Sequence, residues 1–88
     1  MVAFESPTYM LELRHRSNCS RIACAQSGKE IPVLVRSKDN ATAKLIEARG
    51  TLSNDGKSFS IVVKGTDGAQ ETLDLCYRDL LKAFSETA

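Results

Sequence analysis

The stretch LIEARGTLSNDGKSFSIVVKGTDGAQETLDLC, residues 45–76, decides the fold, because apolar residues alternate on both sides of two glycine-containing turns. A two-residue turn at Asp55 and Gly56 is typical of a β-hairpin. With this turn, apolar or small residues face one another: Leu52 with Phe59, Gly50 with Ile61, and Ala48 with Val63. A slip of one residue would turn the apolar side of a strand outward, so we expect this register.

The second turn is expected to be one residue longer than the first. A loop limited to residues 67–68 would place Ile61 opposite Asp74, whereas a loop over residues 66–68 places it opposite Leu73. The longer loop needs a residue in the left-handed conformation, which Gly68 adopts easily. The other pairs in this register are Phe59 with Leu75 and Val63 with Glu71.

The upstream half of the chain predicts further strands. A two-residue loop at residues 27–28 gives two facing apolar pairs, Cys24 with Ile31 and Ile22 with Val33. Pro32 cannot donate a hydrogen bond to a neighbouring strand, so its strand is expected at a sheet edge or at a bulge. Tyr9, Leu11 and Leu13 alternate with Met10, Glu12 and Arg14, which predicts one more strand.

The C-terminus changes to a helical period. Apolar residues recur at spacings of three and four, at Tyr77, Leu80, Leu81 and Phe84, which indicates an amphipathic helix of about three turns. Asp74 is the predicted N-cap. A helix this short needs a surface to pack on, and the outward-facing apolar residues expected beneath it are Leu34, Leu45 and Val62.

These patterns predict one mainly antiparallel α+β domain over residues 1–88. Five or six short strands form a small curled sheet or a barrel of SH3-like or Sm-like shape, with a C-terminal amphipathic helix. The alternative is an open antiparallel sheet with a second helix near residues 38–49, where Ala41, Leu45 and Ala48 also have helical spacing. The hairpin register favours a strand from about Lys44.

Composition places the chain among soluble globular domains. Its 88 residues are 42% hydrophobic and 26% charged, which argues against disorder. Twelve basic and eleven acidic side chains leave a formal charge of +1, which disfavours a strongly basic nucleic-acid coat and an acidic DNA mimic. No apolar run is long enough for a membrane helix, and we expect no secretion signal and three cysteines as free thiols. We therefore expect a cytoplasmic protein without membrane contact.

Motifs for catalysis and for metal or cofactor binding are weak. The Gly-Lys-Ser at residues 56–58 follows Gly50 at a spacing one residue too long for a phosphate loop. A four-ligand zinc site would need every histidine and cysteine of the chain: His15, Cys19, Cys24 and Cys76. Cys24 and Cys76 are expected to be small buried residues, and His15 to lie in a polar loop between strands. The sequence thus predicts a protein that is not an enzyme and holds no metal or cofactor.

The clearest functional signal is an uneven distribution of charge. Residues 14–38 carry six basic side chains and one acidic one, whereas the chain from Leu45 onward has five basic and seven acidic residues. A concentrated basic surface attracts anionic partners. The predicted binding residues are Arg14, His15, Arg16, Arg21, Arg36 and Lys38.

By elimination, we expect a small binding protein, an adaptor or inhibitor that acts by occupying the surface of a partner protein. The alternative is a small nucleic-acid-binding β-barrel that contacts phosphates through residues 14–38. Against this alternative, the aromatic residues that could stack on bases are assigned mainly to the core. An unpaired sheet edge could also accept a second copy of the chain.

Overall fold

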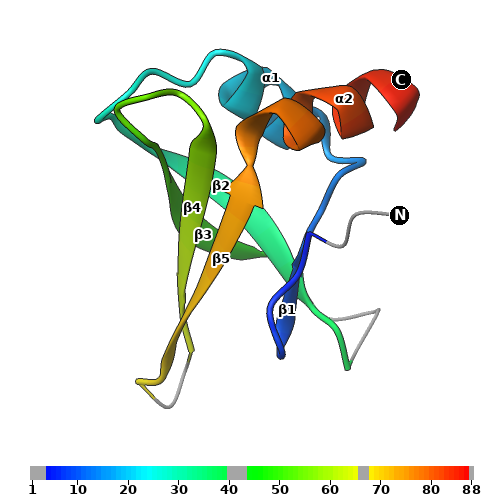
Figure 1. Cartoon of the computed structure of the whole chain (residues 1–88). Coiled ribbons are helices and arrows are strands. Elements are labelled where there is room, and N and C mark those ends of the chain that lie inside the picture. The colour runs from blue at the N-terminus through cyan, green and yellow to red at the C-terminus, as the bar shows by residue number, and fades with distance from the viewer. Residues whose placement is uncertain (1–3, 40–43, 66–67, 88) are drawn as a thin grey trace.

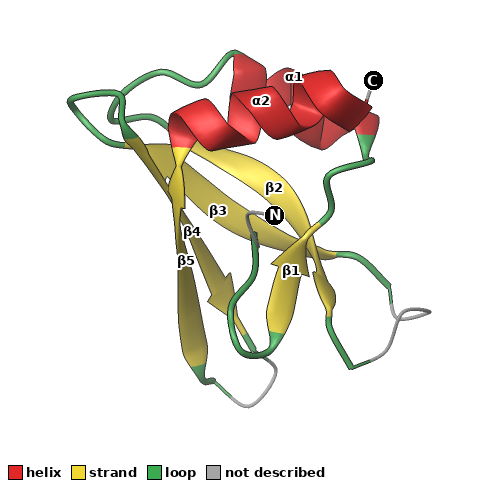
Figure 2. Ribbon diagram, turned by 45° about the vertical axis from the view of Figure 1, so that its right-hand side comes forward, coloured by secondary structure: helices red, strands yellow, loops and turns green. Residues whose placement is uncertain are grey.

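The computed structural model describes residues 4–39, 44–65 and 68–87. In chain order, its elements are β1 (Tyr9–Leu11), α1 (Arg16–Ala23), β2 (Glu30–Ser37), β3 (Ile46–Leu52), β4 (Ser58–Lys64), β5 (Gln70–Cys76) and α2 (Tyr77–Thr87). The five strands form one antiparallel sheet in the order β1-β2-β3-β4-β5, curled into a half-barrel. Both helices lie side by side across one end of this sheet (Figures 1 and 2). The predicted curled antiparallel sheet with a C-terminal helix is confirmed.

The registers predicted for the hairpins at residues 55–56 and 66–68 are confirmed. Leu52 pairs with Phe59 and Gly50 with Ile61 across the first turn, and Ile61 pairs with Leu73 across the second. Gly68 has a φ of 86°, the left-handed conformation expected of it. Gly50 is required for a further reason, because a side chain there would run into the ring of Phe59.

The segment predicted as a strand before residue 27 is a helix, and the hairpin at residues 27–28 is wrong. Residues 16–23 form α1, whose buried side chains Asn18 and Ile22 lie four residues apart and therefore on one face of the helix. Strand pairing gives β2 the neighbours β1 and β3 instead. Cys24 and Cys76, expected in the core, are exposed thiols at the end of α1 and of β5.

Asn18 fixes α1 to the sheet. Its Nδ2 donates to the carbonyls of Glu12 (2.8 Å) and Leu34 (2.9 Å), and its Oδ1 accepts the Leu34 N–H (2.8 Å). The side-chain amide thus takes the place of a strand neighbour where β1 has ended. The strand of Pro32 was predicted at a sheet edge or at a bulge, but β2 is an internal strand between β1 and β3, so the predicted edge strand is wrong. Pro32 pairs with Arg49 of β3 and lies beyond the β2 residues that pair with β1.

The second helix closes the core from the inner side of the sheet. Leu80 and Phe84 are buried in the same cluster as Phe59 and Ile61, and the Tyr77 hydroxyl donates to the Ile22 carbonyl of α1 at 2.6 Å. Burial raises the pKa of that hydroxyl. The prediction that this helix covers the outward-facing apolar residues is therefore wrong, and those residues stay partly exposed on the outer face: Leu34, Leu45 and Val62.

Two smaller predictions have different outcomes. Asp74 is not a helix cap, because it lies within β5 and accepts a hydrogen bond from the Ser60 hydroxyl at 2.8 Å. The strand expected from about Lys44 begins at Ile46, so the alternative helix near residues 38–49 is wrong over β3. Residues 40–43 of that alternative, Ala41 included, lie outside the described residues.

The chain before β1 connects the two edges of the half-barrel. Phe4 is buried in the core. The Glu71 carboxylate of β5 accepts hydrogen bonds from the Ser6 hydroxyl (2.7 Å) and the Thr8 N–H (3.1 Å). Neither described helix has the length and apolar character needed to cross a membrane.

Candidate functional site

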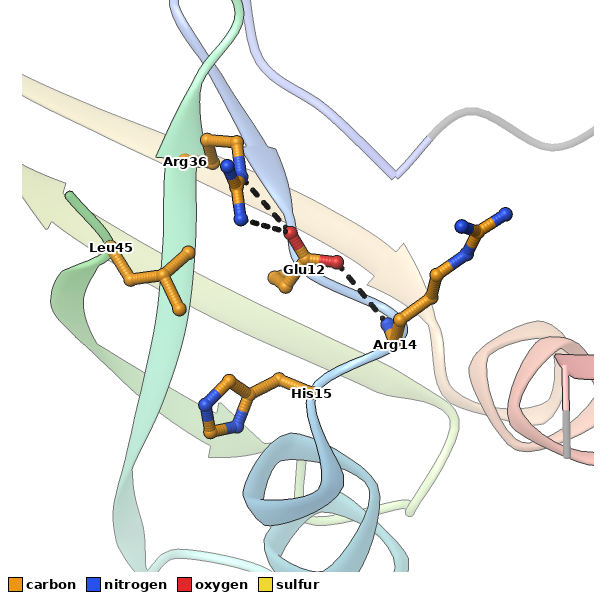
Figure 3. Close-up of a pocket in the computed structure, with 5 residues that line it drawn as sticks. All are labelled: Glu12, Arg14, His15, Arg36 and Leu45. Atoms are coloured by element: carbon orange, nitrogen blue, oxygen red, sulfur yellow. Dashed lines mark hydrogen bonds and ion pairs between the residues drawn. The ribbon is translucent and has the colours of Figure 1, made fainter. Parts of the chain in front are cut away.

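The structure divides the six predicted binding residues between α1 with the two residues before it and the end of β2. Arg14, His15 and Arg36 line one open hollow of about 390 Å³, together with Glu12 and Leu45. Figure 3 shows Arg36 beside Glu12 on one side of this hollow, with Leu45 and His15 on the other sides. The structure therefore brings half of the predicted set together.

The two basic residues of the β2 end are already paired with carboxylates. Arg36 contacts Oε2 of Glu12 through Nε (3.0 Å) and Nη2 (2.9 Å). Lys38 forms an ion pair with Glu5 at 3.1 Å and donates to the Ser6 carbonyl at 3.4 Å. Part of their charge is therefore neutralised within the molecule, and both side chains are held in place.

Arg14, Arg16 and Arg21 differ from these two, and we call them the α1 arginines. All three side chains are exposed. Within the described residues, no carboxylate lies at ion-pair distance from any of them. Arg21 donates a hydrogen bond from Nη1 to the Pro32 carbonyl at 3.4 Å. The α1 arginines thus present their charge to solvent.

The sequence around the α1 arginines leaves this charge unopposed. No acidic residue occurs between Glu12 and Glu30, and α1 has no acidic residue in its first turn. His15 occupies the N-cap position but makes no capping hydrogen bond, and its Nδ1 instead lies 2.7 Å from the Ser17 hydroxyl. The cations around α1 can therefore attract a negatively charged partner.

Aromatic side chains are not placed to stack on nucleic-acid bases. The three phenylalanines are buried: Phe4, Phe59 and Phe84. Tyr9 packs against the core, and Tyr77 is partly buried with its hydroxyl bonded to the backbone of α1. Among the described residues, the α1 arginines therefore lie on a surface without an exposed phenylalanine or tyrosine ring, unlike the stacking surfaces of single-strand binders.

Residues suited to metal binding do not gather in the described parts of the chain. There, no three His, Cys, Asp or Glu side chains come together as ligands would. Cys19 is half-buried, and its thiol contacts the Leu13 carbonyl at 3.4 Å. His15 lies at the start of a helix rather than in the loop between strands that the sequence predicted.

Two residues of the hollow were missed by the sequence reasoning. Glu12 is the last acidic residue before the basic stretch, a signal that was visible in the sequence. Leu45 was noted only as an outward-facing apolar residue.

No known protein family, curated protein or solved structure matches this chain.

Proposed function

We propose that this chain is a small non-enzymatic binding protein that occupies an acidic surface of a partner protein. The observation that carries the proposal is the contrast between the α1 arginines, which have no carboxylate partner among the described residues, and the paired Arg36 and Lys38. Exposed arginines that form no internal pairs are available for carboxylates of a partner. The free thiols fit a reducing cytoplasm as the setting.

A protein partner is favoured over nucleic acid by what surrounds these arginines. Single-stranded nucleic acid is bound by basic grooves that also supply stacking rings, and the rings of this chain are directed to the core. The even overall balance of charge also makes a general phosphate-binding surface less suitable. Binding through phosphates alone is kept as the competing outcome of the test.

The test compares a labelled polyglutamate peptide with an oligouridylate of equal charge, using fluorescence anisotropy. Replacing Arg14, Arg16 and Arg21 with alanine should weaken peptide binding at least roughly tenfold, because each lost contact to a charged group contributes about 1.5–3 kcal/mol when fully made. The matched control removes the same charge elsewhere, at three exposed cations of the β3–β4 hairpin: Arg49, Lys57 and Lys64.

The outcomes distinguish an acidic protein partner from a nucleic-acid partner. Loss of peptide binding in the α1 variant with little change in the control supports the proposal. Equal losses in both variants would show that only overall charge matters and would refute it. Tighter binding of oligouridylate than of peptide, with a steep dependence on salt, would replace it with the nucleic-acid alternative. Thermal unfolding of both variants checks that the fold is retained.

A further inference from the structure

We propose that α2 forms a second part of the partner-binding surface, in which Arg78 and Lys82 bind carboxylates of the acidic partner segment and Leu81 contacts an aliphatic side chain of it. This inference rests on the proposed function and extends its surface from α1 to the neighbouring helix. The two helices lie side by side across one end of the sheet (Figures 1 and 2), so one segment can contact both.

Leu81 is a large apolar side chain that the fold leaves uncovered. It is 38% exposed, whereas Leu80 and Phe84 of the same helix are buried in the core. Leu81 follows Tyr77 by four residues, and the Tyr77 hydroxyl reaches the backbone of α1 at 2.6 Å. Residues four apart lie on the same side of a helix, so Leu81 lies on the side of α2 that is next to α1.

Two cations flank Leu81 on the exposed surface of α2. Arg78 and Lys82 are exposed, and within the described residues no carboxylate lies at ion-pair distance from either side chain. They are four residues apart, a spacing at which like charges repel and destabilise a helix. A carboxylate bound between them offsets this repulsion, so the local charge is complementary to an acidic partner.

The carboxylates of α2 lie away from this part of the helix. At 3.6 residues per turn, Asp79 and Glu86 are roughly 140–160° around the helix from Leu81, on the side far from α1. The two helices and the residues just before α1 together carry five arginine and lysine side chains against these two carboxylates, over residues 14–23 and 77–87. The surface beside Leu81 therefore has an excess of positive charge.

The segment that fits this surface combines carboxylates with an aliphatic residue. Covering Leu81 removes apolar surface from water, which a segment of carboxylates alone cannot do. An anionic membrane offers a similar combination of charge and apolar groups. A helix at a membrane surface inserts a broad apolar face, however, whereas Leu80 and Phe84 of α2 are buried in the core. The occupant is therefore an acidic protein segment with a leucine-like side chain, and the membrane is an outcome of the test.

The test measures two labelled peptides of equal length and charge by fluorescence anisotropy. One repeats glutamate, glutamate and leucine, and the other repeats glutamate, glutamate and serine. The wild-type chain should bind the leucine peptide roughly tenfold more tightly, as burial of one aliphatic side chain provides. Leu81→Ala should abolish this preference and leave binding of the serine peptide unchanged. The matched control is Met10→Ala, because Met10 is 40% exposed on β1, and it should keep the preference.

A second pair of variants tests the cations. Replacing Arg78 and Lys82 together with alanine should weaken binding of both peptides roughly tenfold, because charge-assisted contacts are lost. The control replaces Arg49 and Lys64, two exposed cations of the sheet, and should bind both peptides as the wild-type chain does. Thermal unfolding checks that every variant is folded.

Failure of this inference is distinguishable from failure of the proposed function. Peptide binding that is lost in the alanine variant of the α1 arginines but unchanged in both α2 variants would overturn the inference and leave the proposed function standing. If neither peptide binds the wild-type chain, both are refuted. Equal loss of the preference in Leu81→Ala and Met10→Ala would overturn the contact assigned to Leu81. Tighter binding to phosphatidylserine vesicles than to either peptide, lost in the same α2 variants, would assign the surface to a membrane instead.

Discussion

Replacing Asn18 with alanine should destabilise the protein more than any other change to a polar side chain of α1. Asn18 is completely buried, and its amide makes all of its hydrogen bonds to the backbone. Without the amide, the Leu34 carbonyl still accepts the Glu12 N–H at 3.2 Å. The Glu12 carbonyl and the Leu34 N–H lose the partner that Asn18 supplies. Two unsatisfied groups at this depth should lower the free energy of unfolding by about 2–4 kcal/mol.

The measurement is urea unfolding of wild type and variant, followed by circular dichroism. A domain of this size has roughly 4–13 kcal/mol of stability in total, so the predicted loss should shift the urea midpoint clearly without a change in slope. Ser20→Ala, on the exposed face of α1, is the matched control and should stay within about 0.5 kcal/mol of wild type. A loss below about 1 kcal/mol for Asn18→Ala would refute the view that this amide holds α1 on the sheet.

Two further predictions concern α2 and the N-terminal segment. Leu80→Ala should lower the free energy of unfolding by about 2–5 kcal/mol because Leu80 is fully buried. Leu81→Ala should lower it by under about 1 kcal/mol because Leu81 is 38% exposed. Similar losses for the two variants would contradict the placement of α2. Hydrogen bonds from Thr8 and Ser6 hold the pKa of Glu71 below its ordinary value of 4.5. The lowered pKa stabilises the fold above that value, and this contribution is lost as the pH falls through the lower, folded-state pKa. Glu71→Gln should therefore flatten the acid side of a plot of stability against pH, and an unchanged acid side would rule this contact out.

The sheet could be predicted where the apolar pattern and the turn residues indicate the same strand register. Around Gly56 and Gly68 the apolar residues alternate on both sides of the turn, so only one register buries them. The C-terminal helix was equally clear, because Leu80 and Phe84 lie four residues apart in a segment that breaks the two-residue alternation. In these segments the local pattern and the tertiary packing agree.

Helix α1 could not be found in this way because half of its buried face is polar. Patterns of apolar residues identify Ile22 but not Asn18, whose burial depends on backbone groups of Glu12 and Leu34, which lie 6 and 16 residues away in the sequence. The ion pairs of the site also depend on the tertiary structure and not on the apolar pattern of the sequence. Arg36 meets Glu12 only because β1 and β2 pair in one particular register. The basic character of the site was visible in the sequence, but the division between paired and exposed cations was not.

The fold of α1 and the proposed binding surface depend on the same contacts. Eight residues without a side-chain cap do not make a stable helix by themselves, so α1 persists because Asn18, Ile22 and the Tyr77 hydroxyl hold it against the sheet and α2. These contacts lie on the buried side of the helix, whereas Arg16 and Arg21 are exposed. The side chains that position the helix are therefore distinct from those that would meet a partner. A partner that binds the exposed side only when α1 is folded must in turn stabilise α1, by an amount set by its concentration relative to its Kd.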